Sequence, residues 1–129
     1  MNDNSVKSYR DLRVWQNAME IAEDVYRITR GFPKEEMFAM VTQMRRAAAS
    51  IAANIAEGYG RDSSRSYAHF LRVSQGSLKE LETHLLLSAR VQLTSMELAS
   101  PILEKCDVLG RMLRALIRNI DSRGERQPV

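Results

Sequence analysis

Proline and glycine are scarce in this chain, which contains three and six of them in 129 residues. A β sandwich with many loops would need more of both, whereas the abundant alanine, leucine, arginine, glutamate and methionine favour helices by their intrinsic propensity. A chain of this length fits one domain with a single hydrophobic core. The composition alone therefore favours an all-α domain.

Cysteine and long apolar runs are almost absent as well. Cys106 is the only cysteine, which excludes an internal disulfide and a metal site built from several thiolates. The N-terminal residues lack the apolar stretch of a secretion signal, and no apolar run reaches the roughly 18 residues that a membrane-spanning helix needs. We expect a soluble, cytoplasmic protein with no membrane partner.

Apolar residues recur every three or four positions along most of the chain, which is the period of helices that bury one face. In the first such segment Val14, Ala18, Ile21 and Val25 follow this spacing. Short connections between long helices indicate an antiparallel up-down-up-down four-helix bundle with left-handed supercoiling. The predicted segments are an N-terminal arm at 1–10, helices at about 11–30, 34–57, 63–93 and 95–121, and a flexible C-terminal tail at 122–129.

Local signals at the helix boundaries allow further predictions. Asp11 has the side chain of an N-cap for the first helix. The sequence TSME at 94–97 is typical of a capping box that begins the fourth helix, unless Pro101 moves the start nearer Ser100. Ser74, the polar residue in the apolar stripe of the third helix, is expected to hydrogen-bond to its own backbone.

The sequence EGYG at 57–60 ends the second helix. Gly58 suits the left-handed position that follows a helix, and Tyr59 is then placed to fold back on the last turn. A carboxylate is unfavourable at this end of the helix dipole, so Glu57 should have a cationic partner. The candidates for this partner are Arg61, Arg46 and Arg10.

Small residues form a second stripe on the same helix, at Ala49, Ala52, Ala53 and Ala56. Such a stripe lets another backbone approach closely, either within the bundle or across a boundary between subunits. The stripe therefore predicts close packing, and it leaves open which of the two contacts the alanines serve.

Basic residues are concentrated in two segments, 43–72 and 111–126, each with a net charge of +3, although the whole chain also carries only +3. In an up-down-up-down bundle the end of the second helix, the start of the third and the end of the fourth lie at one pole. We therefore predict that RNA or DNA binds this basic pole, with Tyr59 stacking on bases beside Arg61. The predicted contact residues are Arg46, Tyr59, Arg61, Arg65, Arg72, Arg114 and Arg118.

The same arginines allow a different interpretation, in which they complement a helix dipole or form salt bridges between the subunits of an interaction scaffold. An enzyme is not indicated, because His69 and His84 lie fifteen residues apart on one helix, too far to share a metal. Cys106 occupies an apolar heptad position, where we expect a buried, unreactive thiol. The sequence therefore predicts no catalytic residue, no metal and no cofactor.

Three stretches carry a family resemblance, at 8–38, 43–61 and 70–88. Within them the sequences DLRVWQ at 11–16 and IAEGYGR at 55–61 are the most specific. The chain resembles the four-helix-bundle proteins encoded by intervening sequences in bacterial 23S ribosomal RNA genes. This resemblance implies a homopentamer without enzymatic activity. A similarity to the accessory variability proteins of diversity-generating retroelements implies a reverse transcriptase as partner. Ala52 departs from the family pattern, because many relatives have proline there.

Overall fold

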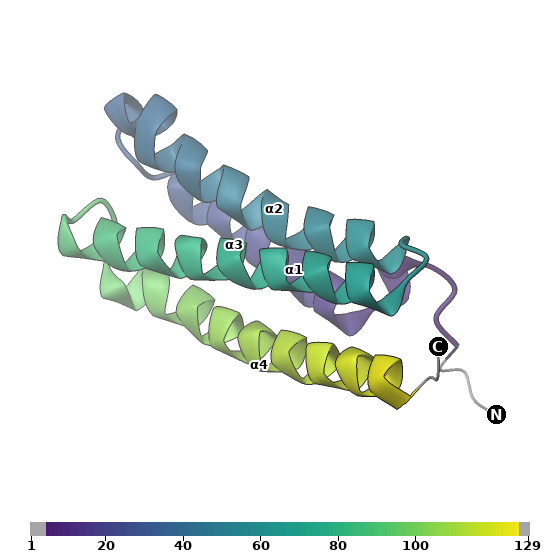
Figure 1. Cartoon of the computed structure of the whole chain (residues 1–129). Helices are drawn as coiled ribbons and strands as arrows, with labels where there is room; N and C mark the ends of the chain where they lie inside the picture. The colour runs from purple at the N-terminus through teal and green to yellow at the C-terminus, as the bar shows by residue number, and fades with distance from the viewer. Residues whose placement is uncertain (1–4, 127–129) are drawn as a thin grey trace.

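The structure of the chain, a computed structural model, describes residues 5–126, with side chains as far as Arg123 (Figure 1). Four helices make up most of it: α1 (Arg13–Thr29), α2 (Thr42–Tyr59), α3 (Ser64–Arg90) and α4 (Met96–Arg126). Three short helical segments precede α1 and α2, namely η1 (Tyr9–Asp11), η2 (Lys34–Glu36) and the π-helical η3 (Met37–Val41). No strand occurs among the described residues, so the predicted all-α fold is confirmed.

The four helices form an antiparallel bundle in which each helix packs against the next and α4 returns to α1. Ion pairs between distant residues fix these directions: Arg72 of α3 meets Asp121 of α4, and Asp24 of α1 meets Lys105 of α4. The start of α1, the end of α2, the start of α3 and the end of α4 share one end of the bundle (Figure 1), which we call the proximal pole. The opposite end is the distal pole. The predicted up-down-up-down four-helix bundle is confirmed.

One hydrophobic core takes a stripe of buried residues from every helix. The four positions predicted from the helical period of the first helix, Val14, Ala18, Ile21 and Val25, are all buried. Ile51 of α2 and Leu81 of α3 are fully enclosed as well. The stripe of α4 shifts by one residue near its end, where Ile117 is buried and Leu116 is only partly buried. The core fixes how each helix is rotated, and therefore which charged residues face its neighbours.

Small polar side chains join α2 to α3. Ser74 is fully buried in α3, and its hydroxyl donates to the carbonyl of Ile51 in α2 at 2.9 Å. The prediction that Ser74 bonds to its own backbone is therefore wrong, because a carbonyl of the neighbouring helix lies within reach. Nearby, the hydroxyl groups of Ser77 and Ser50 lie 2.8 Å apart. These bonds hold the two helices in register.

The first three helices have boundaries that differ from the predicted ones. Asp11 lies in η1, where its carboxylate accepts the N–H groups of Lys7 and Ser8, so it is not the N-cap of α1. The predicted helix at 34–57 begins as η2 and η3 before α2, which ends at Tyr59. The third helix stops at Arg90, three residues early, and Gln92 has a φ of 66° in the turn that leads to α4.

The fourth helix begins at Met96, and the hydroxyl of Ser95 accepts the N–H of Leu98. Pro101 lies inside this helix and does not move its start toward Ser100. The helix continues through residue 126, so the described part of the predicted flexible tail, residues 122–126, is helical. A single glycine at position 124 lowers helix stability without ending the helix. Residues 127–129 lie outside the described part of the chain.

Gly58 lies inside α2 rather than after it, and no glycine among the described residues has a positive φ. Its predicted left-handed conformation is therefore wrong. A Cβ atom at this position would lie 2.9 Å from the Cβ of Phe70 and 3.1 Å from the carbonyl oxygen of Tyr67. Glycine is required here because α3 approaches the backbone of α2 too closely for any side chain.

We predict that Gly58→Ala destabilises the fold, although alanine is the better helix former. The added methyl group meets atoms of α3 that cannot move freely, and such overpacking costs roughly 1–3 kcal/mol. The measurement is the free energy of unfolding from urea denaturation.

The matched control is Gly76→Ala in α3, where a Cβ would have no atom within 4 Å. This substitution should instead stabilise the helix by about 0.5–1 kcal/mol, because alanine loses less conformational entropy than glycine. Stabilisation by both substitutions would contradict the close approach at Gly58.

Candidate nucleic-acid interface

The aromatic and basic residues at the end of α2 contact one another. The guanidinium of Arg61 lies 2.9 Å from the carboxylate of Glu57 and 4.6 Å from the ring centre of Phe70. The predicted cationic partner of Glu57 is therefore Arg61. Because this guanidinium is held between an acid and an aromatic ring, a ligand would have to displace it from both.

The sequence predicted that Tyr59 folds back on the last turn of α2, and this prediction is wrong. Its ring packs edge-on against Tyr67 of α3 with centres 6.1 Å apart, and its hydroxyl donates to the carbonyl of Val6 at 3.4 Å. Burial raises the pKa of Tyr67, the nearby Tyr59 raises it further, and Arg123 lowers it. Tyr59 therefore joins the N-terminal arm, α2 and α3, and its ring is partly buried rather than open for stacking.

Arg46 lies apart from the proximal pole. It is exposed on α2, thirteen residues before the end of that helix, or about 20 Å along its axis. Its neighbour Arg45 instead covers the ring of Tyr26 at 4.4 Å and donates to Thr29 at 2.9 Å. Arg46 and the arginines of α3 and α4 therefore do not form one site.

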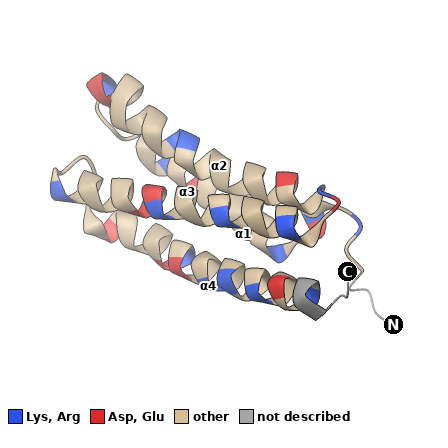
Figure 2. Ribbon diagram, in the orientation of Figure 1, with Lys and Arg blue, Asp and Glu red and all other residues tan. Residues whose placement is uncertain are grey.

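The remaining predicted arginines gather where α3 packs against α4. Arg65 and Arg72 on α3 are followed by Lys79, each seven residues and about 10.5 Å from the next, so the three side chains lie in a row along the helix. On α4, Arg114 and Arg118 are four residues apart and therefore share a face. Figure 2 shows the basic residues along both helices toward the proximal pole.

The surface between α3 and α4 is hollowed in two places. The first hollow lies at the proximal pole and has a volume of about 320 Å³. The second, further along the same helix pair, has a volume of about 340 Å³. We call the two together the α3/α4 groove. The first hollow is lined by Ser64, Arg65, Arg72, Ile120 and Asp121. The second is lined by Gln75, Gly76, Leu78, Lys79, Gly110 and Arg114.

Two glycines open the second hollow, because neither Gly76 nor Gly110 carries a side chain that could fill the space between the helices. Gly76 faces open space, and a Cβ at Gly110 would meet only the side chain of Leu78, at 3.6 Å. The two glycines, together with Gln75 and Lys79, were not among the site residues predicted from the sequence. The seven-residue recurrence of basic residues could have indicated Lys79, whereas the glycines gave no comparable signal.

Some of the cations in the α3/α4 groove are paired and others are not. Arg72 lies 2.6 Å from Asp121, and Lys79 lies 3.1 Å from Glu82, which is outside the hollow. Arg65 and Arg114 line the hollows without an ion pair to any described residue. Among the described residues the only acid that lines either hollow is Asp121, so these lining residues carry a net positive charge.

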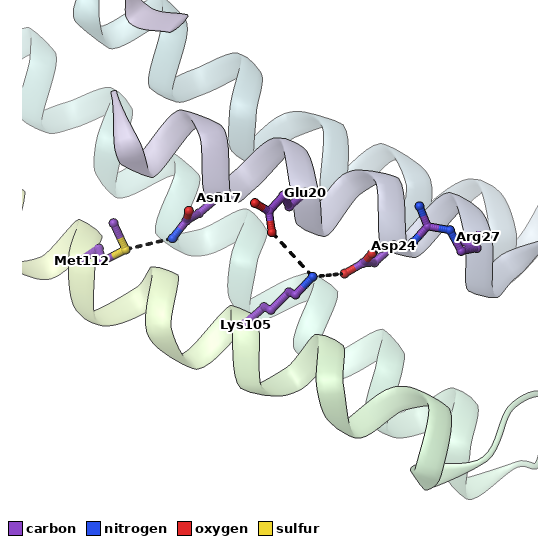
Figure 3. A network of polar contacts seen from close by, with 6 residues as sticks. All are labelled: Asn17, Glu20, Asp24, Arg27, Lys105 and Met112. Carbon is purple, nitrogen blue, oxygen red and sulfur yellow. Dashed lines mark hydrogen bonds and ion pairs between the residues drawn. The ribbon is translucent and has the colours of Figure 1, made fainter. Parts of the chain in front are cut away.

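The surface between α1 and α4 differs in charge. It also has two hollows, and Lys105 of α4 lines both. Its ammonium lies 2.8 Å from the carboxylate of Asp24 and 3.6 Å from that of Glu20, both on α1 (Figure 3). The hydrogen bond to Asp24 raises the pKa of Lys105. Among the described residues, three acids (Glu20, Asp24 and Glu104) and two bases (Arg27 and Lys105) line these hollows. The lining therefore has a net negative charge, which would repel a polyanion.

The predicted alanine stripe is split by the packing of α2. Ala52 is buried and Ala56 is partly buried, whereas Ala49 and Ala53 are exposed. The latter two therefore do not pack within the bundle. Their alternative role, at a boundary between subunits, stays a prediction.

A family model described as 23S rRNA-intervening sequence protein matches residues 10–115. The chain belongs to this family. The chain is also similar to a solved structure from Bacteroides thetaiotaomicron, a protein with unknown function from the S23 ribosomal protein family. The two chains have a TM-score of 0.73 and 23% sequence identity, over 81% of this chain and 97% of the other. At this identity the likeness shows the fold alone. No curated protein matches the chain.

The described residues show no arrangement typical of a metal site. No three His, Cys, Asp or Glu residues among them are arranged to hold a metal ion. His84 lies 3.4 Å from Glu80 on the same helix. Between residues 5 and 126, no helix combines the length and apolar character needed to cross a membrane. Cys106 is buried as predicted, and burial raises the pKa of its thiol to about 12.

We predict that Cys106 resists alkylation in the folded protein. The thiolate is the reactive form, and a thiol with a pKa of about 12 is almost entirely protonated at pH 8. Reaction with iodoacetamide, followed by mass spectrometry, should be slow in buffer and fast in denaturant. Equal rates in the two conditions would contradict the burial of this side chain.

Proposed function

We propose that this protein binds nucleic acid through the phosphate backbone, along the α3/α4 groove. The observation that carries the proposal is the presence of two hollows in line. Each has a basic side chain from α3, and Asp121 is the only acid that the described part of the chain contributes to either lining. The planar guanidinium of arginine matches two phosphate oxygens at once, which favours phosphate over smaller anions. The proposed role is binding without catalysis.

The length of the groove favours a polymer over a single small anion. Arg65 and Lys79 are fourteen residues apart, which corresponds to about 21 Å along α3. An isolated phosphate could occupy one hollow, whereas a nucleic-acid strand could use both. The described residues that line the two hollows include no aromatic side chain, so we propose contacts with the nucleic-acid backbone rather than with stacked bases.

This proposal narrows the basic pole predicted from the sequence. Arg65, Arg72 and Arg114 line the groove, and Arg118 is exposed beside it on α4. Arg61 and Tyr59 make contacts within the chain, and Arg46 lies on another helix face. The family's name, which refers to a ribosomal RNA gene, is consistent with an RNA ligand without identifying one.

We expect Arg65→Glu combined with Arg114→Glu to weaken binding of a fluorescent single-stranded RNA of about 20 nucleotides by roughly 100-fold near 0.1 M salt. Two lost phosphate contacts should also reduce the slope of log affinity against log salt by about 1.4. Fluorescence anisotropy measures both quantities, and a DNA strand of the same sequence compares the two polymers.

The matched control replaces two distal arginines, Arg30→Glu with Arg90→Glu. Both are exposed, and neither forms an ion pair with a described residue, so the net charge changes equally. An equal loss of affinity in this control would reject the groove in favour of a general charge effect. No binding by the unaltered protein, even at low salt, would reject the proposed function.

A second proposed function is an assembly scaffold, favoured by the exposed face of α2 and η3. Phe38 has 94% of its surface exposed, which is unusual for a large apolar side chain. Thr42, Arg46, Ala49 and Ala53 continue along the same helix face and are exposed too. Their spacing of three or four residues suits a contact with a helix of another subunit.

Ala53→Arg should lower the mass of such an assembly in sedimentation velocity, because a long charged side chain would enter the contact. The free energy of unfolding should change by no more than about 0.5 kcal/mol, as is usual for exposed positions. Ala115→Arg, at an exposed alanine of α4, is the control. An unchanged mass in both variants would reject this face of α2 as a subunit contact.

A further inference from the structure

The first hollow of the α3/α4 groove already contains an anion supplied by the protein itself. Asp121 of α4 reaches across to Arg72 of α3, with its Oδ2 atom 2.6 Å from Nη2 of the guanidinium. Among the ion pairs of the described residues, this is the one that joins α3 to α4. Arg65 lines the same hollow and forms no ion pair with a described residue.

We infer that the first hollow is a phosphate subsite, and that the carboxylate of Asp121 occupies the place of a ligand phosphate. This inference rests on the proposed nucleic-acid binding and identifies a position at which the ligand binds. A carboxylate and a phosphate both present oxygens that a guanidinium can bind in the same geometry. Arg72 therefore already has the orientation that a phosphate would require.

The pair between Asp121 and Arg72 is suited to exchange. The two side chains remain 43% and 54% exposed, so water solvates both partners and the pair contributes little to stability. A phosphate entering the hollow could be bound by Arg72 together with Arg65, whereas Asp121 binds Arg72 alone. A ligand phosphate can thus replace the carboxylate without leaving a buried charge unpaired.

In the part of the chain that the structure describes, no acid lines the second hollow as Asp121 lines the first. Lys79 of the second hollow pairs with Glu82 of the same helix, which does not line the hollow, and Arg114 forms no ion pair with a described residue. Asp121 therefore makes the two hollows unequal. An isolated phosphate must displace the carboxylate of Asp121 from its bulk concentration alone. A nucleic-acid strand already bound at the second hollow holds its next phosphates close to Arg72, and this high local concentration helps them to displace the carboxylate. Asp121 would in this way favour polymers over free phosphate.

The test is Asp121→Asn, which keeps the size of the side chain and removes its charge. With Arg72 released, affinity for the single-stranded RNA should rise about three- to tenfold near 0.1 M salt, and the salt dependence should become steeper by about 0.7. The gain in affinity for inorganic phosphate, measured by competition with the RNA, should be at least as large.

Asp107→Asn provides a closely matched control. Asp107 lies fourteen residues earlier on α4, nearly on the same face, and pairs with Arg111 outside both hollows. The Asp107→Asn substitution changes the net charge of the protein by the same amount as Asp121→Asn. The double variant Asp121→Asn with Arg72→Gln tests the pathway, because the gain should disappear when Arg72 is absent.

The possible outcomes separate the inference from the proposed function. A larger gain for Asp121→Asn than for Asp107→Asn, dependent on Arg72, supports the phosphate subsite. Equal gains, or a loss of affinity on Asp121→Asn with an unchanged unfolding curve, overturn the subsite while leaving nucleic-acid binding in place. Absence of binding in every variant and in the unaltered protein overturns both.

Discussion

Two helices of this bundle can lie as close as they do only because Gly58 has no side chain. A Cβ at this position would be 2.9 Å from the Cβ of Phe70, so α3 rests directly against the backbone of α2. The buried hydroxyl of Ser74 then reaches the carbonyl of Ile51 and fixes the register. With α3 held in this rotation, its row of basic residues at positions 65, 72 and 79 must face α4. The position of the basic groove thus depends on a contact on the other side of the same helix.

The bundle also separates its charges between two helix pairs that share α4. Toward α1, Lys105 of α4 is surrounded by the carboxylates of Asp24 and Glu20, which join the two helices (Figure 3). Toward α3, the described residues that line the hollows include several cations and one acid, Asp121. A small net charge for the whole chain therefore conceals two surfaces of opposite character. For the proposed nucleic-acid ligand, such a separation would favour one orientation before contact, since like charges repel a polyanion from one side of α4 and opposite charges attract it to the other.

The sequence predicted the fold far better than the details of the site. Helix number, order and core follow from apolar spacing, because burial of one face requires that period whatever the neighbours are. The prediction for Gly58 was wrong because glycine occurs both where a helix ends and where a neighbouring helix packs closely, and the sequence does not distinguish these two roles. Ser74 was misassigned because its partner, Ile51, is near only in space. Arg65, Arg72 and Arg114 were predicted, but separating them from Arg46 and Arg61 required the rotation of each helix and the ion pairs within it. The pentamer and the reverse transcriptase partner implied by the family resemblance stay predictions.

The second hollow exists partly because Gly76 and Gly110 have no side chains, and this origin has an evolutionary consequence. Gly76 lies in the middle of α3, where glycine lowers helix stability by about 0.5–1 kcal/mol relative to alanine. Almost any substitution at Gly76 would stabilise the helix and would also place a side chain in the second hollow, which would make the groove shallower. If the hollow serves binding, selection for stability and selection for function act in opposite directions on this one residue, as is common at functional sites. In that case Gly76 is retained, although it destabilises α3, because it keeps the second hollow open for a ligand.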